Sequence, residues 1–225
     1  MVEIIYKNRN YVIINKPAGV PSQSDASGDK DALTLTEEAL SAVGEGDKLW
    51  LVHRLDRTVG GLMVFARNRQ YAATLSELVR DKEISKEYLA VVDGVCDGGV
   101  MEDMLYKDAR VGKAFVADSG KKGAKRARLT YRALGTVSTQ RGEKTLVAVT
   151  LDTGRFHQIR AQFSSRGLPL CRDAKYGSKD KSGRDIALFA FRLTLPIGEG
   201  ESYSAMPPVK EYPWCLFDND LYGSV

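Results

Sequence analysis

Hydrophobic and polar residues follow patterns along the chain that predict strands and helices in a mixed order. Short β-branched or apolar runs predict strands at residues 3–6, 11–15, 49–52, 62–66, 88–92, 128–134, 145–151 and 187–195. Helical spacing predicts helices at residues 33–43, 68–81 and 156–166, and Gly44 and Gly167 are placed to end the first and the last of them. Because strands outnumber helices and do not alternate regularly with them, we expect an α+β fold: a mixed, largely antiparallel sheet flanked by helices and loops.

Two segments between these elements lack both patterns. The Asp-Gly-Gly sequence at residues 97–99 predicts a tight turn. Residues 106–126 are polar, basic and contain several glycines, which predicts a mobile loop or a hairpin. No repeat, low-complexity tract or linker divides the chain, so we expect a single domain over residues 1–225.

The composition is that of a folded protein from a reducing compartment. The 225 residues are 43% hydrophobic and 28% charged, which is an ordinary globular balance. No apolar run approaches the roughly 20 residues of a membrane span, and the N-terminus lacks a signal-peptide pattern. Three separated cysteines and two histidines predict neither a disulfide framework nor a metal site. These features favour a cytoplasmic location.

The net charge of +4 conceals two basic blocks on an otherwise acidic chain. Residues 107–132 hold nine Lys and Arg against two Asp, and residues 154–184 hold eight against two. Such blocks are typical of a polyanion-binding face, although each block alone also fits a solvated loop. Together they favour a nucleic acid as the partner.

Two charged side chains occupy positions that suggest chemistry. Asp56 lies between two predicted core strands, and its neighbours Arg54 and Arg57 favour its ionised form. A Gly-Gly pair follows, where the backbone can approach a ligand closely. At about 100° per residue, Arg160 projects from the apolar stripe of its predicted helix and so needs an anionic partner. Taken alone, each also fits a structural role, as a turn aspartate and as an arginine whose guanidinium reaches water.

Five segments, in order along the chain, resemble the RluA family of RNA pseudouridine synthases. The two most specific are His-Arg-Leu-Asp-Arg at residues 53–57 and Gly-Arg-Phe-His-Gln-Ile-Arg at residues 154–160. The others are residues 15–19, 86–90 and 167–177. The resemblance runs from about Lys16 to the last predicted strand, which is nearly the whole chain. It implies the catalytic fold of that family, with no separate N-terminal RNA-binding domain.

The resemblance also implies roles for individual residues. Asp56 matches the catalytic aspartate, and Arg160 matches the arginine that pairs with it. Tyr88 matches the active-site tyrosine that stacks on the target base and is proposed to assist proton transfer. Arg54 matches the arginine that fills the gap left by the flipped uridine. The motifs and the first basic block add RNA contacts, which we expect at Arg57, Lys86, Arg155, Lys121, Lys122, Lys125, Arg126 and Arg128.

The implied reaction detaches uracil from C1′ of the ribose, rotates it and reattaches it through C5. It involves no redox change, so we expect no cofactor and no bound nucleotide. We expect ribosomal or transfer RNA as the partner. We also expect the protein to be a monomer. The base must leave the stack before it can react. An ionised aspartate beside an arginine suits a nucleophile. Three roles are open to the carboxylate: attack at C6, attack at C1′ and deprotonation of the sugar.

The chain departs from the family pattern in two places. Val59 and Gly60 replace a Thr-Ser pair, so a hydroxyl contact in that loop is lost or is supplied by another residue, such as Thr58. Phe189 stands where the family often has a histidine.

Two other functions stay open at this point. One is a catalytically silent RNA-binding module, against which the presence of Asp56, Tyr88 and Arg160 argues. The other is an unrelated aspartate-dependent hydrolase, such as a glycosidase. That class requires a second carboxylate, and the motifs contain none beside Asp56.

Overall fold

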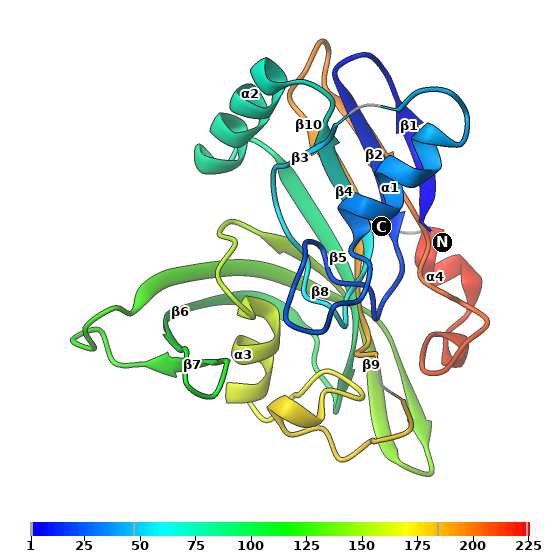
Figure 1. Ribbon diagram of the computed structural model, residues 1–225. Coiled ribbons are helices and arrows are strands. Elements are labelled where there is room, and N and C mark those ends of the chain that lie inside the picture. Colours follow the sequence, from blue (N-terminus) through cyan, green and yellow to red (C-terminus); the bar gives the residue numbers. More distant parts are fainter. Residues whose placement is uncertain (1, 47, 184, 224) are drawn as a thin grey trace. The chain divides into compact units, whose positions relative to one another are not determined.

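The computed structural model describes residues 2–46, 48–183, 185–223 and 225 (Figure 1). Arg184, the last residue of the second basic block, lies outside the described residues. The chain forms two compact units, which we call unit 1 and unit 2. Unit 1 comprises Met1–Lys86 and Phe189–Pro207, and unit 2 comprises Glu87–Leu188 and Pro208–Val225. The expected single domain stays a prediction.

Unit 1 is built on a mixed sheet. Its strands are β1 (Glu3–Lys7), β2 (Tyr11–Lys16), β3 (Trp50–Leu51), β4 (Gly60–Ala66), β10 (Leu188–Leu195) and β11 (Glu201–Ser204). β1, β2, β4 and β10 are neighbours in that order. The first two of these pairings are antiparallel, whereas β10 runs parallel to β4. β3 also pairs with β4, and β11 pairs with β10.

Side chains at the helix starts explain where the two helices of unit 1 begin. The carboxylate of Asp31 accepts a hydrogen bond from the Thr34 N–H at 2.7 Å, just before α1 (Ala32–Ser41). The amide oxygen of Asn68 accepts one from the Tyr71 N–H at 2.8 Å, just before α2 (Arg69–Arg80). Such caps satisfy backbone donors that have no partner within the helix. Leu75 of α2 packs into a core with residues of β2, β4 and β10.

Unit 2 is built on an antiparallel sheet. Its strands are β5 (Ser85–Asp93), β9 (Gly142–Leu151), β8 (Lys125–Thr139), β6 (Gly98–Asp108) and β7 (Lys113–Ala117), in this spatial order. Each pairs antiparallel with the next. Helix α3 (Gln158–Ser165) packs against β6 and β7, and α4 (Asn219–Gly223) follows near the C-terminus. Figure 1 shows β6, β7 and the start of β8 as a long green arm beside α3.

The predicted elements are present, and the α+β class is confirmed. The turn predicted at residues 97–99 is wrong, because Gly98 and Gly99 begin β6 and the chain bends at Gly94 instead. Residues 106–126 form a hairpin rather than a loop. Only Met101 and Leu105 of β6 are buried, so charged neighbours hide its alternation in the sequence. The structure also contains β11 and α4, which the patterns did not predict.

Candidate active site

Asp56 lies in the loop that joins β3 to β4, and its backbone neighbours are held on both sides. The Ser22 hydroxyl donates to the Leu55 carbonyl at 2.8 Å and accepts from the Leu55 N–H at 3.0 Å. On the other side, the Gly19 N–H donates to the Arg57 carbonyl at 2.8 Å. These bonds join residues 19–22 to the loop, so the half-buried Asp56 is presented from a fixed backbone.

Lys16, at the end of β2, also forms hydrogen bonds to this loop. Its side chain is fully buried, and its ammonium donates to the carbonyl oxygens of Val20 at 2.7 Å, Pro17 at 2.9 Å and Arg57 at 3.4 Å. A buried charge is costly unless hydrogen bonds satisfy it. The three carbonyls meet part of that requirement and connect the turn after β2 to the residue that follows Asp56.

Ser22 makes a hydroxyl contact to this loop, whereas the replacement of the Thr-Ser contact by Thr58 stays a prediction. The two glycines of the motif serve strand packing. Gly61 has a φ of 116°, and a Cβ built there would lie 2.3 Å from the Ala190 oxygen of β10. A Cβ on Gly60 would lie 3.2 Å from the Phe189 ring. In this structure, the segment that lies close to the backbone of the Gly-Gly pair is strand β10.

His53, the first residue of the same motif, is a structural residue that the sequence analysis did not single out. It is buried, and its Nε2 accepts a hydrogen bond from the Val64 N–H at 3.2 Å. Burial and the nearby ammonium of Lys86 hold the pKa of His53 well below its usual value, so the ring is neutral. Its Nδ1 atom, which must carry the proton, has no hydrogen-bond partner among the described residues.

The three RNA contacts predicted in unit 1 have different surroundings. Arg54 is exposed on the loop. The Arg57 guanidinium donates to the Gly19 carbonyl at 2.9 Å and forms ion pairs with Asp25 and Asp29, so its charge is already partnered. Lys86 is half-buried, and burial lowers its pKa to about 8.

In unit 2, Arg160 forms a two-pronged ion pair with Asp173. Its Nε lies 2.7 Å from Oδ2 and its Nη2 lies 2.9 Å from Oδ1. Arg160 is 5% exposed and Asp173 is 1% exposed, so the guanidinium does not reach water. The anionic partner demanded by the helical position is therefore present. Asp173 was not predicted in this role, although it lies in the segment 167–177 that resembles the family. The pairing of Arg160 with Asp56 stays a prediction.

The remaining residues of the second motif fix α3 to its surroundings. The Gln158 side chain donates to the Arg128 carbonyl of β8 at 3.1 Å. The Tyr176 hydroxyl accepts from the Ala114 N–H of β7 at 2.7 Å and lies 2.9 Å from Nδ1 of His157. The Tyr176 ring centre also lies 4.9 Å from the Arg160 guanidinium carbon. Arg160 is thus oriented by both an ion pair and a ring.

Tyr88 lies on β5, opposite Val149 of β9, and is 7% exposed. Both it and Arg160 belong to unit 2. Its stacking on a target base stays a prediction.

The basic residues of the arm fall into two groups. Lys121 and Lys122 lie in the turn between β7 and β8, and Lys125 begins β8. All three are exposed, and none forms an ion pair with a residue in the described ranges. The Lys121 ammonium lies 4.9 Å from the centre of the Tyr106 ring. This pairing of a cation with a half-buried aromatic is typical of surfaces that bind single-stranded nucleic acid.

The arginines of the arm, in contrast, are partnered within the protein. Nε of Arg126 lies 2.8 Å from a carboxylate oxygen of Glu102. Arg128 forms an ion pair with Asp152 and lies 3.7 Å from Glu102. Exposed Arg155 donates to the Arg126 carbonyl at 3.0 Å. Of the predicted RNA contacts on the arm, the lysines therefore offer the more available charge.

No group of three or more His, Cys, Asp or Glu side chains suited to a metal ion occurs within the described residues. Cys96, Cys171 and Cys215 are free thiols. Over the same residues, no helix combines the length and apolar character needed to cross a membrane.

Residues 10–165 match the family model described as RNA pseudouridylate synthase. An uncharacterized RNA pseudouridine synthase of Zymomonas mobilis is 34% identical over 92% of this chain and 93% of its own length. The ribosomal large subunit pseudouridine synthase D of Borreliella burgdorferi is 28% identical over 99% of this chain and 69% of its own length. The corresponding synthase C of Haemophilus influenzae is 31% identical over 79% of this chain and 53% of its own length. The chain thus spans little more than half the length of several relatives of this kind.

Two solved human structures share the fold. The protein titled RNA Pseudouridylate Synthase Domain Containing 4 superimposes with a TM-score of 0.75 at 23% identity, over 92% of this chain and 88% of its own. The protein titled RNA Pseudouridylate Synthase Domain Containing 1 gives the same TM-score at 21% identity, over 92% of this chain and 84% of its own. The fold expected from the motifs is therefore confirmed.

Proposed function

This chain belongs to the RNA pseudouridylate synthase family, and we propose from that premise that it converts specific uridines of structured RNA to pseudouridine. Ribosomal RNA of the large subunit is the first candidate, because relatives over much of the chain carry that substrate in their names. Transfer RNA is the second. The observation that carries the proposal is the bracing of the loop around Asp56 by residues 16–22.

In the proposed reaction Asp56 is the catalytic residue. The N1–C1′ bond of the target uridine breaks and a C5–C1′ bond forms, while C5 loses a proton and N1 gains one. The product is an isomer of the substrate, so the balance requires no oxidant, reductant or co-reactant. A fixed backbone suits this role, because a carboxylate held in place meets the reacting atoms without reorganisation.

Arg160 and Tyr88 complete the proposed catalytic set. Arg160 is the proposed cationic partner of the Asp56 carboxylate. Its own orientation is fixed by the two-pronged ion pair with Asp173. Tyr88 stacks on the flipped base, and exposed Arg54 fills the space that the base leaves.

The exposed lysines of the arm bind RNA phosphates in this proposal. Lysine suits contacts of this kind, because its ammonium is a mobile point charge with three donors. The protein acts as a monomer in the cytoplasm, without a cofactor. Three free cysteines support a reducing compartment.

Release of tritium from RNA labelled at C5 of uridine tests the proposal, because C5 loses its hydrogen as pseudouridine forms. We would compare the native protein with Asp56→Asn and with the matched control Asp81→Asn, which removes an exposed carboxylate at the end of α2. We expect the native protein and the control to release tritium, and Asp56→Asn to be slower by about a thousandfold or more.

Each other result has a distinct meaning. Equal release by the native protein and Asp56→Asn would exclude Asp56 as the catalytic residue. Free uracil in the products would indicate a hydrolase. RNA binding without tritium release, over fractions of ribosomal and transfer RNA, would indicate a silent binding module.

A further inference from the structure

Much of the second basic block is used inside unit 2. Arg160 pairs with Asp173, Arg166 pairs with Asp103 at 3.0 Å, and the Arg172 guanidinium donates to the Tyr212 carbonyl at 2.8 Å. These cations fix the structure and are poorly placed to bind a ligand. Lys175, Lys179 and Lys181 of the block are exposed and form no such contact with the described residues, and the last two flank residue 180.

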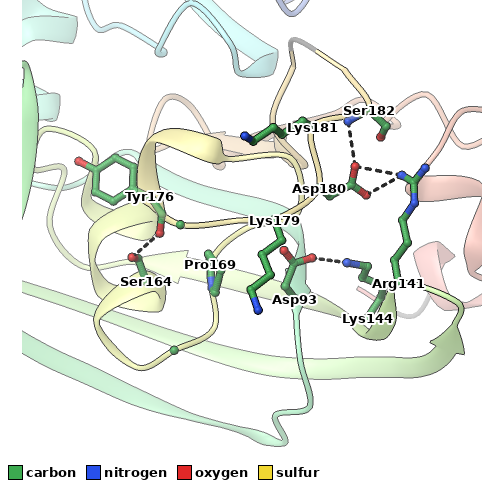
Figure 2. A pocket seen from close by; sticks show the side chains of 12 residues that line it. Asp93, Arg141, Lys144, Ser164, Pro169, Tyr176, Lys179, Asp180, Lys181 and Ser182 are labelled. Atoms are coloured by element: carbon green, nitrogen blue, oxygen red, sulfur yellow. Dashed lines mark hydrogen bonds and ion pairs between the residues drawn. The ribbon is translucent and has the colours of Figure 1, made fainter.

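A cleft of about 960 Å³ opens at that point, wholly within unit 2 (Figure 2). Its charged lining residues are Asp93, Arg141, Lys144, Lys179, Asp180 and Lys181. Asp93 and Tyr88 lie on the same strand, five residues apart, which is about 17 Å along β5. Tyr176, whose ring contacts the Arg160 guanidinium, also lines the cleft, so the cleft adjoins the part of the candidate active site that lies in unit 2.

Both acidic residues of the cleft are already neutralised by partners. Asp93 forms an ion pair with Lys144 and accepts from the Ser178 hydroxyl at 2.6 Å. Lys144 is 2% exposed, so this pair belongs to the floor of the cleft rather than to its opening.

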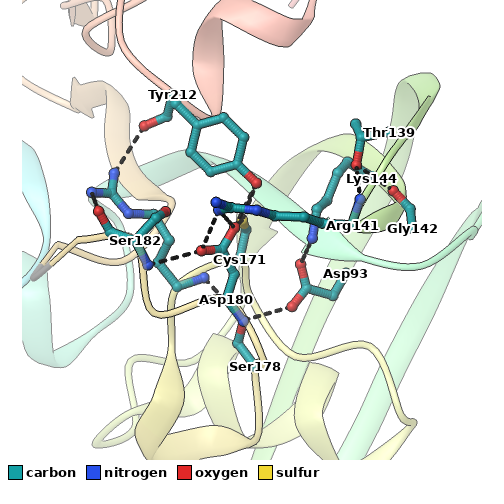
Figure 3. A network of polar contacts seen from close by, with 11 residues as sticks. Asp93, Thr139, Arg141, Gly142, Lys144, Cys171, Ser178, Asp180, Ser182 and Tyr212 are labelled. Carbon is teal, nitrogen blue, oxygen red and sulfur yellow. Dashed lines mark hydrogen bonds and ion pairs between the residues drawn. The ribbon is translucent and has the colours of Figure 1, made fainter.

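Asp180 is the centre of the second cluster, shown in Figure 3. It accepts from Arg141 at 3.0 and 3.2 Å and from the Tyr212 hydroxyl at 2.6 Å. Burial acts to raise the pKa of Asp180, but hydrogen bonds from Tyr212, Ser182 and Arg141 together hold it below its usual value. The buried carboxylate anchors the segment to the β8–β9 turn and to the C-terminal segment.

The two lysines on either side of Asp180 are exposed to solvent. Lys179 and Lys181 are exposed, whereas Asp180 between them is 6% exposed. Neither lysine forms an ion pair or hydrogen bond with any residue that the structure describes. Asp180 therefore holds two available positive charges at the edge of the cleft. The acidic residues of the cleft, Asp93 and Asp180, are already paired with cations. A site with this charge and this openness suits phosphate groups on a flexible or extended ligand.

We propose that this cleft is a second RNA-binding site, in which Lys179 and Lys181 bind backbone phosphates of the substrate next to the candidate active site. The inference rests on the proposed function only for the choice of RNA as the source of the phosphates.

The salt dependence of RNA binding tests the site. The variant Lys179→Gln/Lys181→Gln removes the two charges, and the control Lys48→Gln/Lys210→Gln removes two exposed charges elsewhere, so both have the same net charge. Each lost phosphate contact lowers the slope of log K against log salt by about 0.7 to 0.9. We expect the cleft variant to lose about 1.4 to 1.8 from the slope and the control to keep the native slope. A native slope in the cleft variant, or an equal loss in both, would overturn the proposal.

Lysine acetylation with and without RNA gives a second readout that does not depend on a substitution. Mass spectrometry should show Lys179 and Lys181 acetylated several times more slowly in the presence of RNA, with Lys48 and Lys210 unaffected. The proposal would be overturned if Lys179 and Lys181 were acetylated at the same rate with and without RNA. It would also be overturned if inorganic triphosphate protected them and RNA did not. Protection by RNA without tritium release would support this site and contradict the proposed function.

Discussion

The imidazole of His53 accepts a hydrogen bond from the backbone N–H of Val64 at 3.2 Å, and this bond fills a gap along one edge of β4. β3 pairs with the last two residues of β4, and β10 pairs with the first two. Between them the side chain of His53 takes the place of a strand partner. The chain can therefore leave the sheet at this point and begin the loop that carries Asp56.

Replacing His53 tests whether the ring acts through this bond. His53→Leu leaves the buried Val64 N–H without an acceptor, so we expect a loss of about 1–3 kcal/mol in unfolding free energy. His53→Gln offers an amide oxygen to the same donor and should recover part of that loss. Denaturant titrations of the three proteins measure the difference. Equal stability of His53→Leu and the native protein would contradict the role.

The same ring makes stability depend on pH in a predictable direction. The pKa of His53 in the folded protein lies well below its usual value of 6.5, because burial and the charge of Lys86 disfavour the imidazolium. Below about pH 6.5 the unfolded chain therefore binds the proton more readily, and folding stability falls. The stability advantage of the native protein over His53→Gln should narrow as the pH falls from 7 to 5. A constant difference over that range would count against the assignment.

Lys86 should also make stability rise with pH, but over an alkaline range. Its pKa is about 8 in the folded protein and 10.5 in its ordinary state, because burial disfavours the ammonium. Between these values the unfolded chain holds the proton and the folded protein does not, so stability rises with pH over that window. Lys86→Met should be more stable than the native protein at pH 7 by up to about 3 kcal/mol, and this advantage should disappear near pH 10.5. Unfolding titrations from pH 7 to 10.5 measure it, and an advantage that persists at high pH would refute the explanation.

Gly61 should tolerate no side chain. A Cβ there would lie 2.3 Å from the Ala190 oxygen, on a backbone with positive φ. Because a backbone atom cannot move away as a side-chain tip can, Gly61→Ala should cost about 3 kcal/mol or more. Gly120→Ala is the matched control, since nothing lies within 4 Å of its Cβ position. If thermal unfolding places both variants at the same midpoint, β10 does not pack as described.

The ion pair between Arg160 and Asp173 can be tested by a double-mutant cycle. Asp173→Leu alone leaves a buried guanidinium without this partner, so we expect a loss of about 3–5 kcal/mol. Arg160→Met together with Asp173→Leu removes both charges and should restore most of the stability. Unfolding free energies of the single and double variants give the coupling energy. Additive losses would show that the two side chains do not depend on each other.

The arm should contribute to RNA binding through its lysines more than through its arginines. Lys121, Lys122 and Lys125 are exposed, so replacing all three by Gln should lower the salt slope of RNA binding by about 2 to 2.7. Arg126 and Arg128 are paired with Glu102 and Asp152, so neutralising them should change the slope less per residue. Filter-binding titrations at several salt concentrations separate the two groups. If the lysine variant kept the native salt slope, the three lysines would not bind RNA phosphates.

The sequence predicted most of the fold, because its strands and helices carry strong local patterns. β2 and β9 are β-branched and buried, and α2 begins at a capping asparagine. The start of β6 was predicted as a turn because its first residues are Gly98 and Gly99, and glycines usually mark turns. Its place in the sheet depends on pairing with β8, and no local pattern carries that information.

The candidate site was predictable only in part, for a similar reason. The motif residues are recognisable because they stand close together in the sequence. Ser22 braces a residue 33 positions away, and Asp173 pairs with an arginine 13 positions away, and both are ordinary loop residues in the sequence. Such positioning residues become visible only when the fold brings their segments together.

The parallel pairing of β10 with β4 has a consequence for synthesis on the ribosome. The residues of β4 emerge early, whereas their partner Phe189 emerges after nearly all of unit 2 has been made. A nascent chain therefore carries an incomplete β4 edge for most of its elongation. Open strand edges can pair with other chains. We expect the protein to be most prone to aggregation just before β10 leaves the ribosome, and His53 to protect the part of the edge that it already covers.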